Sequence, residues 1–366
     1  MRILHADTDD LENPLRGGQP VRTFAINSRL ALKHQITTFT SVFRGCKRRQ
    51  ERGGVKYRRL GFRVPGFGLS PHLTFLASLG PVVARTPHDL VIEEFTPPVG
   101  FCLLPWWTCK PVVSTVQWYF FEAWEKRYRM PFFRWMKRIA RTGRYRHFIV
   151  QTDAMARELR QYLPDATFYK IPSGLDVQAF ESEPAIGDYA LFLGRLDIQH
   201  KGLDLLLDSW RQCCAHVPLV IAGEGPGRPT LEARIAEMGL SRVVRLVGHV
   251  EGKVKSELIA GSRLLVMPSR YETFGIVAAE AMAAAKPVVS YDIDHLNEVV
   301  SPPWGLLISP FEIDRYGKAV AELWEEPDRC YRMGALARAK AGDFLWDNIA
   351  KQQEELYLAI SNAHQP

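Results

Sequence analysis

The stretch that decides the fold is VMPSRYETFGIVAAEAMAAAKPVV, residues 266–289. A short apolar strand ends at Pro268, a polar loop follows, and residues 276–285 are apolar at every position except Glu280. An apolar segment of this length predicts a helix that is buried on all sides. A carboxylate inside such a helix is costly unless something hydrogen-bonds it, so Glu280 is a candidate functional residue.

A second carboxylate, Glu272, lies eight residues earlier, in the loop that leads into the helix. Free backbone N–H groups and the positive end of the helix dipole make a helix N-terminus a site for an anion such as a phosphate. Two carboxylates beside a phosphate site suit the hydroxyls of a nucleotide sugar. The alternative is a purely structural strand–helix unit in which a neighbouring Arg satisfies Glu280.

The spacing Glu272-x7-Glu280, within ETFGIVAAEAMAAAKPVV, resembles the signature of the retaining GT-B glycosyltransferases of family 4. The resemblance implies that Glu272 contacts hydroxyls of the donor sugar and that Glu280 holds the ribose. It also implies that backbone amides after the loop lie on the donor diphosphate. The residues expected there are Thr273, Phe274, Gly275 and Ile276.

Two cations surround another turn from strand to helix. Arg195 follows the apolar segment 189–193, and Lys201 lies six residues later. Such a pair can neutralise a diphosphate from two directions, and the resemblance assigns this role to both residues, while the alternative is two exposed loop cations. By the same resemblance, turns near Gly225 and Val250 border the nucleobase through backbone groups, so the sequence does not identify the base. The expected donor is a UDP-sugar or a GDP-sugar.

The N-terminal sequence predicts a first strand–turn–helix unit. Residues 2–6 form a strand, Gly17-Gly18 forms a turn, and residues 21–33 form a helix. The resemblance places the Gly-Gly turn opposite the donor phosphate. Asp7-x-Asp9 suits a metal ion, but we favour a solvated loop with Asp7 near the acceptor, and we expect no metal and no cofactor besides the nucleotide sugar.

Residues 111–117 predict a further strand, which ends in Gln117. Many relatives have His at this place, with its ring near the donor sugar. Gln can hydrogen-bond but cannot take up a proton, which puts acid–base chemistry at this position in doubt. Gln117 and Glu122 are therefore candidates for the cleft only.

The composition is that of a globular protein with two domains. The chain has 366 residues, of which 46% are hydrophobic and 24% charged. We see no signal peptide and no apolar run long enough to span a membrane. The six cysteines show no C-x-x-C pair or metal spacing and are expected to be reduced thiols, which predicts a cytoplasmic location.

The charge is unevenly distributed along the chain. Residues 1–150 hold 25 Lys and Arg against 10 Asp and Glu, whereas residues 151–366 hold 22 against 30. Nine cations lie in Arg44–Arg63, where Gly53-Gly54 predicts a loop or loose hairpin, and nine more lie among aromatics in Trp124–Arg146. Both segments suit an anionic membrane surface, and so a peripheral location on the inner membrane. The alternative for the second segment is a packed helix with a solvated basic face. No recognition motif for nucleic acid is present.

Strands alternating with helices predict an α/β fold of the GT-B type, with two doubly wound Rossmann-like domains facing a cleft. We expect an acceptor domain at residues 1–180, a donor domain at residues 181–345, and a final helix in residues 346–366 that packs back on the first domain. The predicted reaction is retaining transfer of a hexosyl group from the nucleotide sugar to an acceptor hydroxyl, on a lipid-linked or saccharide acceptor. Two alternatives stay open: a soluble transferase for a small-molecule scaffold, and a nucleotide-sugar-binding protein without transferase activity.

Overall fold

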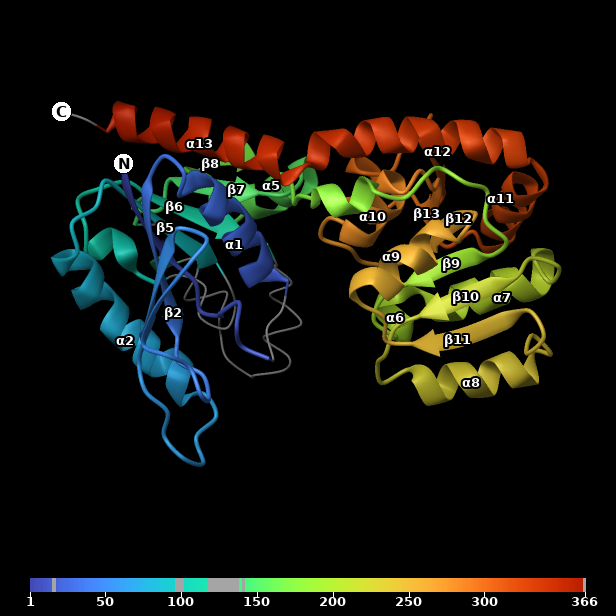
Figure 1. The fold of residues 1–366 in the computed structure, drawn as a ribbon, viewed down its shortest axis with the longest axis horizontal. Helices are drawn as coiled ribbons and strands as arrows, with labels where there is room; N and C mark the ends of the chain where they lie inside the picture. The colour runs from blue at the N-terminus through green and yellow to red at the C-terminus, as the bar shows by residue number, and fades with distance from the viewer. Residues whose placement is uncertain (15–17, 96–101, 118–137, 140–141, 365–366) are drawn as a thin grey trace. The chain divides into compact units, whose positions relative to one another are not determined.

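The computed structural model describes residues 1–14, 18–95, 102–117, 138–139 and 142–364. The chain divides into two compact units, each with its own sheet and helices (Figure 1). Unit 1 comprises Met1–Ser173 and Trp346–Pro366, and unit 2 comprises Gly174–Leu345. Unit 2 is thus one continuous segment, whereas unit 1 is assembled from both ends of the chain.

In unit 1 the described residues form an eight-stranded sheet of order β3-β4-β2-β1-β5-β6-β7-β8. All neighbours are parallel except β3 and β4. The central strands β5 and β6 are buried along their whole length, as expected for a parallel sheet covered on both faces. The strands are β1 (Arg2–Ala6), β2 (Gln35–Ser41), β3 (Arg49–Arg52), β4 (Val55–Leu60), β5 (Leu90–Phe95), β6 (Val112–Val116), β7 (His147–Val150) and β8 (Thr167–Lys170).

The basic segment Arg44–Arg63 contains the antiparallel hairpin β3–β4, which confirms the predicted hairpin. Its turn is Gly53-Gly54, and both glycines have positive φ, which a side chain would strain. A Cβ on Gly54 would also lie 3.2 Å from the Cβ of Ala31. The turn therefore needs glycine to approach the helix below it.

The helices of unit 1 are α1 (Gln19–Leu30), α2 (Ser70–Arg85), α5 (Asp153–Arg160) and α13 (Trp346–Ala363), with a short 3-10 turn η1 (Leu104–Trp106). Helix α13 packs on α1, as Figure 1 shows, and buries Trp346, Ile349 and Tyr357 in the same core as Ile3 and Ile26. This contact confirms the prediction that the last helix packs back on the first domain.

In unit 2 the sheet has six strands in the order β11-β10-β9-β12-β13-β14, and every neighbouring pair is parallel. From β9 the chain first builds outward to β10 and β11 and then returns to β12 on the other side. This reversal is a topological switch point, where α/β proteins hold ligands at the carboxyl ends of the strands. The strands are β9 (Ala190–Leu193), β10 (Leu219–Ala222), β11 (Val244–Gly248), β12 (Leu264–Met267), β13 (Val288–Tyr291) and β14 (Gly305–Ile308).

The helical elements of unit 2 are η2 (Val177–Phe180), α6 (Ile198–Lys201), α7 (Leu203–Cys213), α8 (Arg228–Glu237), α9 (Gly252–Ala260), α10 (Ile276–Ala283), η3 (Leu296–Glu298), α11 (Ile313–Glu325), α12 (Pro327–Ala341) and η4 (Gly342–Phe344). Helix α10 is the apolar helix predicted from the sequence. Its residues Ala278, Ala279 and Ala281 are fully buried, but Ile276 is 39% exposed. The prediction of burial on all sides is wrong for the first turn, because that turn lies at the carboxyl edge of the sheet.

Candidate functional site

The loops that follow β9 and β12 meet at the switch point of unit 2. Strand β9 ends at Leu193 and leads through Arg195 into α6, while β12 leads through Glu272 into α10. Backbone hydrogen bonds hold the two loops together, since the amide of Arg270 donates to the carbonyl of His200 at 2.9 Å. The candidate cations and carboxylates of the two sequence motifs are thus on one edge of one unit.

Glu272 and Lys201 form an ion pair across this edge. The Lys201 Nζ lies 2.6 Å from Glu272 Oε1, and the hydroxyl of Ser269 donates to the same oxygen at 2.9 Å. The Glu272 side chain is 10% exposed and that of Lys201 is 26% exposed, so both can reach a ligand at the surface. Oε2 of Glu272 takes no hydrogen bond from a described residue and is available to a hydroxyl.

Gly275 places the start of α10 beside this pair. It caps the helix with φ 83°, a conformation that favours glycine, and a Cβ there would push on Leu296 Cδ1 at 2.6 Å. The ring of Phe274 is buried against Phe344, with centroids 5.4 Å apart. The first amides of α10 have no acceptor within the helix, so they can donate hydrogen bonds to an anion at this edge.

Glu280 sits within α10 with one of its two oxygens satisfied. Lys255 Nζ lies 2.6 Å from Oε1, so the partner is a lysine of α9 and not the arginine considered as an alternative. Oε2 is buried and has no hydrogen-bond partner among the described residues. An unsatisfied buried acceptor costs about 1–3 kcal/mol, which a ligand hydroxyl would recover.

Arg195 is exposed, and its side chain makes no hydrogen bond or ion pair with a described residue. Its loop is rigid, because the amide of Gly194 donates to the carbonyl of Ala222 and the amide of Gly227 donates to the carbonyl of Leu196. Gly225 lies in the same layer, where a Cβ would come within 2.7 Å of the Leu196 carbonyl. This edge therefore offers an unpaired cation on a fixed loop.

Val250 and Thr273 are half-buried on the loops after β11 and β12.

A pair that the sequence analysis missed fixes the loop carrying Glu272. The Arg270 guanidinium binds Asp204 at the start of α7 through two hydrogen bonds of 2.8 Å each. Although burial raises the pKa of Asp204, the hydrogen bonds and charge of Arg270 leave it lowered overall. The carboxylate thus stays ionised and anchors the loop. Because 66 residues separate the two in sequence, spacing alone could not pair them.

The corresponding edge of unit 1 holds buried carboxyl groups. Asp7, directly after β1, is 1% exposed and accepts hydrogen bonds from Thr23 Oγ1 at 2.9 Å and Gln19 Nε2 at 2.6 Å. Burial, followed by the charge of Glu94, raises the pKa of Asp7 to about 7. Asp7 is therefore a satisfied interior group, unlike the solvated loop residue expected from the sequence.

Glu94 connects this cluster to Gln117. One oxygen of the Glu94 carboxylate lies 3.0 Å from His5 Nε2, and the other accepts from the Gln117 amide at 2.9 Å. His5 and Glu94 are buried, whereas Gln117 is half-buried. The hydrogen bond fixes the orientation of the Gln117 amide, so that its carbonyl oxygen is left to accept from a ligand. Only the strand pattern signalled His5 and Glu94 in sequence, and it gave them no role.

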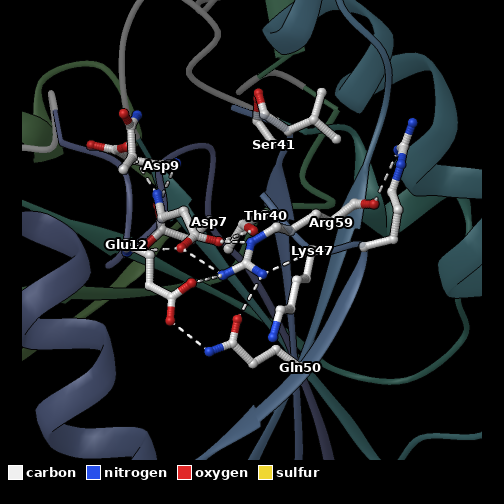
Figure 2. A network of polar contacts seen from close by, with 12 residues as sticks. Asp7, Asp9, Glu12, Thr40, Ser41, Lys47, Gln50 and Arg59 are labelled. Carbon is white, nitrogen blue, oxygen red and sulfur yellow. Dashed lines mark hydrogen bonds and ion pairs between the residues drawn. The ribbon is translucent and has the colours of Figure 1, made fainter. Parts of the chain in front are cut away.

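One residue of the basic segment turns inward. Figure 2 shows Arg59 at the centre of a polar network that reaches Glu12, Gln50 and Thr40. Its guanidinium pairs with buried Asp10 at 2.8 Å and 3.1 Å. Arg59 is 3% exposed and therefore belongs to the interior of unit 1 and not to a basic surface.

Some of the predicted residues lie elsewhere. Gly17, Glu122 and most of the segment Trp124–Arg146 lie outside the described residues. Gly18 precedes α1 with φ −74°, and a Cβ there would meet no atom within 4 Å, so this position makes no demand for glycine.

Among the described residues, no helix is long and apolar enough to cross a bilayer. Within the same residues, no group of three or more His, Cys, Asp or Glu side chains is placed to hold a metal ion. All six cysteines are free thiols.

Two family models together match residues 16–340 of the chain. The model of Glycosyltransferase Family 4 matches residues 16–179, and that of Glycosyl transferases group 1 matches residues 179–340. The chain belongs to glycosyltransferase family 4. The motif Glu272-x7-Glu280 lies in the second matched segment.

Two curated relatives of this family 4 glycosyltransferase differ in how much they share with it. The chain is 26% identical over 351 residues to the MMP alpha-(1->4)-mannosyltransferase of Mycolicibacterium hassiacum, an alignment that takes in 92% of this chain and 80% of the relative. It is 31% identical over 147 residues to the Alpha-D-kanosaminyltransferase of Streptomyces kanamyceticus, which takes in 39% of this chain. That alignment spans only 38% of the length of the kanosaminyltransferase.

Solved structures share the fold over nearly the whole chain. The sucrose-phosphate synthase of Thermosynechococcus elongatus superposes with a TM-score of 0.79 at 21% identity, over 99% of both chains. The Anabaena protein Alr3699/HepE in complex with UDP-glucose superposes with a TM-score of 0.73 at 18% identity, over 98% of this chain and 100% of the other. These likenesses confirm the GT-B type of fold predicted from the sequence.

Proposed function

We propose that the chain is a retaining glycosyltransferase that moves a hexosyl group from a UDP-sugar or GDP-sugar to an acceptor hydroxyl. The observation that carries the proposal is Glu280 Oε2, a buried acceptor oxygen without a partner at the edge where a nucleotide sugar would bind. A ribose hydroxyl is a donor of the right kind for this oxygen. The mannosyltransferase relative and the UDP-glucose complex of a structural neighbour support a hexosyl group and a nucleotide-sugar donor.

In this proposal the cations and amides of unit 2 hold the diphosphate. The Arg195 side chain makes no hydrogen bond or ion pair with a described residue, and Lys201 already lies at the edge, paired with Glu272. The amides of Thr273–Ile276 would bind the diphosphate from the helix end. As the bond from sugar to diphosphate breaks, negative charge grows on the leaving diphosphate. The cations and amides stabilise this growing charge more than they stabilise the intact nucleotide sugar.

Glu272 orients the sugar, while the leaving diphosphate itself takes the proton of the incoming hydroxyl on the same face. This route needs no covalent nucleophile and no metal ion in the chemistry that we propose. Backbone groups near Gly225 and Val250 would border the base. Contacts of that kind depend little on side-chain identity, so the residues here do not distinguish a UDP-sugar from a GDP-sugar.

We propose that unit 1 receives the acceptor. Gln117 is the side chain best placed for this, because Glu94 fixes its amide and leaves a carbonyl oxygen as acceptor. Asp7 is buried, so in this proposal it does not contact the acceptor and only supports the cluster that holds Gln117. The acceptor is either lipid-linked or saccharide at an inner membrane surface, or else a small-molecule scaffold. A protein that binds the nucleotide sugar without turnover is the remaining alternative.

Calorimetric titration of UDP, GDP and ADP tests the donor site. We expect one nucleotide to bind and the Glu280→Ala and Arg195→Ala variants to lose about tenfold or more in affinity, because each removes a charge-assisted contact. Glu257→Ala serves as the control, since Glu257 is an exposed residue of α9 that pairs with Lys253. If no nucleotide binds, or if the two site variants bind as tightly as the control, the proposed donor site is wrong.

Turnover separates the transferase from the binding protein. Incubation of the donor with mixed saccharide, lipid-linked and small-molecule acceptors should release the nucleoside diphosphate and retain the anomeric configuration in the product. Tight donor binding without any release would favour the binding protein.

A further inference from the structure

An exposed apolar loop follows β4 in unit 1. Residues 62–69 are all exposed, and they include Phe62 at 57%, Phe67 at 48% and Leu69 at 48%. Leu73, in the first turns of α2, adds a further apolar side chain at 51%. Single exposed apolar residues are ordinary, but several within one short loop mark a surface that contacts something other than water.

The loop has a defined structure that displays these side chains. Val64 and Phe67 form an antiparallel bridge around Gly66, which has φ 78°. Ser70 Oγ accepts from the Val64 amide at 2.8 Å and donates to the Phe67 carbonyl at 2.7 Å. These hydrogen bonds fix the loop against the start of α2 while its apolar side chains stay exposed.

A segment with exposed cations adjoins the loop. Strands β2 and β4 are parallel and end side by side at Ser41 and Leu60, so segment 42–48 and the loop leave from the same edge (Figure 1). Arg48 donates to the Gly61 carbonyl at 2.5 Å, which joins the two segments directly. The exposed cations here are Arg44, Lys47, Arg48 and Arg63. Residues 42–49 and 61–73 contain no Asp or Glu.

We propose that residues 62–69 insert into the headgroup region of an anionic lipid bilayer, with Arg44, Lys47 and Arg63 on the lipid phosphates. Exposed apolar side chains beside exposed cations match an interface in which anionic groups overlie hydrocarbon. The charge complementarity selects this occupant over a neutral apolar partner, which would leave the cations without counter-charges. This inference rests on the proposed function and deepens it, because insertion of the loop would bring unit 1 to a lipid-linked acceptor.

Vesicle co-sedimentation of the full chain tests the loop. The probes are vesicles of phosphatidylcholine alone and of phosphatidylcholine mixed with phosphatidylglycerol, each at low and high salt. We expect binding to the anionic vesicles. The triple variant Phe62→Ser, Phe67→Ser, Leu69→Ser should bind at least about tenfold more weakly at both salt concentrations, since it loses the inserted area. The double variant Arg44→Gln, Lys47→Gln should lose binding chiefly at low salt, where the attraction is least screened.

Leu32→Ser is the matched control, because Leu32 is 86% exposed in unit 1 but lies in the turn after α1. The thermal midpoint of each variant is measured first and should equal that of the parent, since the altered side chains are exposed. The proposal is overturned if the parent binds no vesicles, if the triple variant binds like the parent, or if Leu32→Ser loses as much as the triple variant. A change of oligomeric state in the triple variant without a change in vesicle binding would equally overturn it, in favour of a protein partner.

Nucleotide titration of the same variants separates this proposal from the donor site. The triple variant should bind the nucleotide as the parent does. Vesicle binding that persists in a chain that binds no nucleotide would refute the proposed function and leave the loop proposal standing. Nucleotide binding without vesicle binding would refute the loop proposal and leave the proposed donor site standing.

Discussion

The two units carry carboxylates at the same place in the same kind of sheet, but they treat them differently. In unit 1, Asp7 and Glu94 are buried at the switch point between β1 and β5, and each is held by several protein donors. In unit 2, Glu272 and Glu280 are partly exposed at the switch point between β9 and β12. Each forms an ion pair with one lysine, Lys201 or Lys255. Glu280 also has an oxygen with no partner among the described residues.

The difference shows how a ligand site can be recognised. A polar cluster whose groups satisfy one another has little left to offer a ligand, and its charges mainly set local stability and shape. A cluster with unused donors and acceptors has capacity for a ligand. On this criterion we propose the edge of unit 2 as the binding edge, although the edge of unit 1 holds more buried ionisable groups. Among the described residues of the unit 1 cluster, the half-buried Gln117 and Gln19 connect the buried carboxyl groups Glu94 and Asp7 to the surface.

The largest expected effect concerns turnover at unit 2. Glu272→Ala should lower kcat about 10²- to 10³-fold, because it removes the proposed acceptor of the sugar hydroxyls and releases Lys201 from its ion pair. The thermal midpoint should change little, since the side chain lies at the surface edge. Steady-state kinetics and thermal unfolding of the same sample check both statements. Unchanged turnover would remove Glu272 from the site.

The next prediction compares stability in the two units. Glu94→Gln should lower the free energy of unfolding by about 2–3 kcal/mol, because the new amide cannot accept from both His5 and Gln117. Glu280→Gln should cost less than about 1 kcal/mol in the ligand-free protein, since one of its oxygens is already unsatisfied. Urea unfolding of the two variants measures this difference. Equal losses would show that the two edges are built alike.

The smallest expected effect is a pH dependence in unit 1. The pKa of Asp7 is raised from 3.8 to about 7 in the folded chain, so the unfolded chain releases its proton first as the pH rises. The folded state therefore loses stability as the pH rises from about 4 to about 7, and the loss is constant above that range.

Asp7→Asn should remove this part of the pH dependence. Urea unfolding of the parent and the variant at several pH values checks it, with Asp9→Asn, half-buried in the same loop, as the control. Parallel stability profiles for the parent and Asp7→Asn would contradict the raised pKa.

Features that depend on neighbouring residues could be predicted from the sequence. The apolar run 276–285 gave helix α10, the Gly53-Gly54 turn gave the hairpin, and the spacing of Glu272 and Glu280 gave the family. The positions of these residues on one edge follow from parallel strand order, which alternating strands and helices also indicate.

Partners that are distant in the sequence could not be predicted. Lys255 lies 25 residues from Glu280, and Lys201 lies 71 residues from Glu272, so only the folded chain shows which cation meets which carboxylate. Arg59 was grouped with surface cations because a charged residue is usually solvated, whereas a buried acid, Asp10, draws it inside. The exposure of the apolar side chains at 62–69 could not be predicted either, because proline and glycine indicate a turn without indicating what its side chains face.

The contribution of α13 to unit 1 has a consequence for biosynthesis. Unit 2 is complete once the ribosome has passed Leu345, but the core around Ile3 and Ile26 still lacks Trp346, Ile349 and Tyr357. Domains generally fold in the order in which they are made, so here the unit that starts first must wait longest. Until α13 emerges, the nascent chain exposes an apolar face of α1, and this interval is when it would depend most on chaperones.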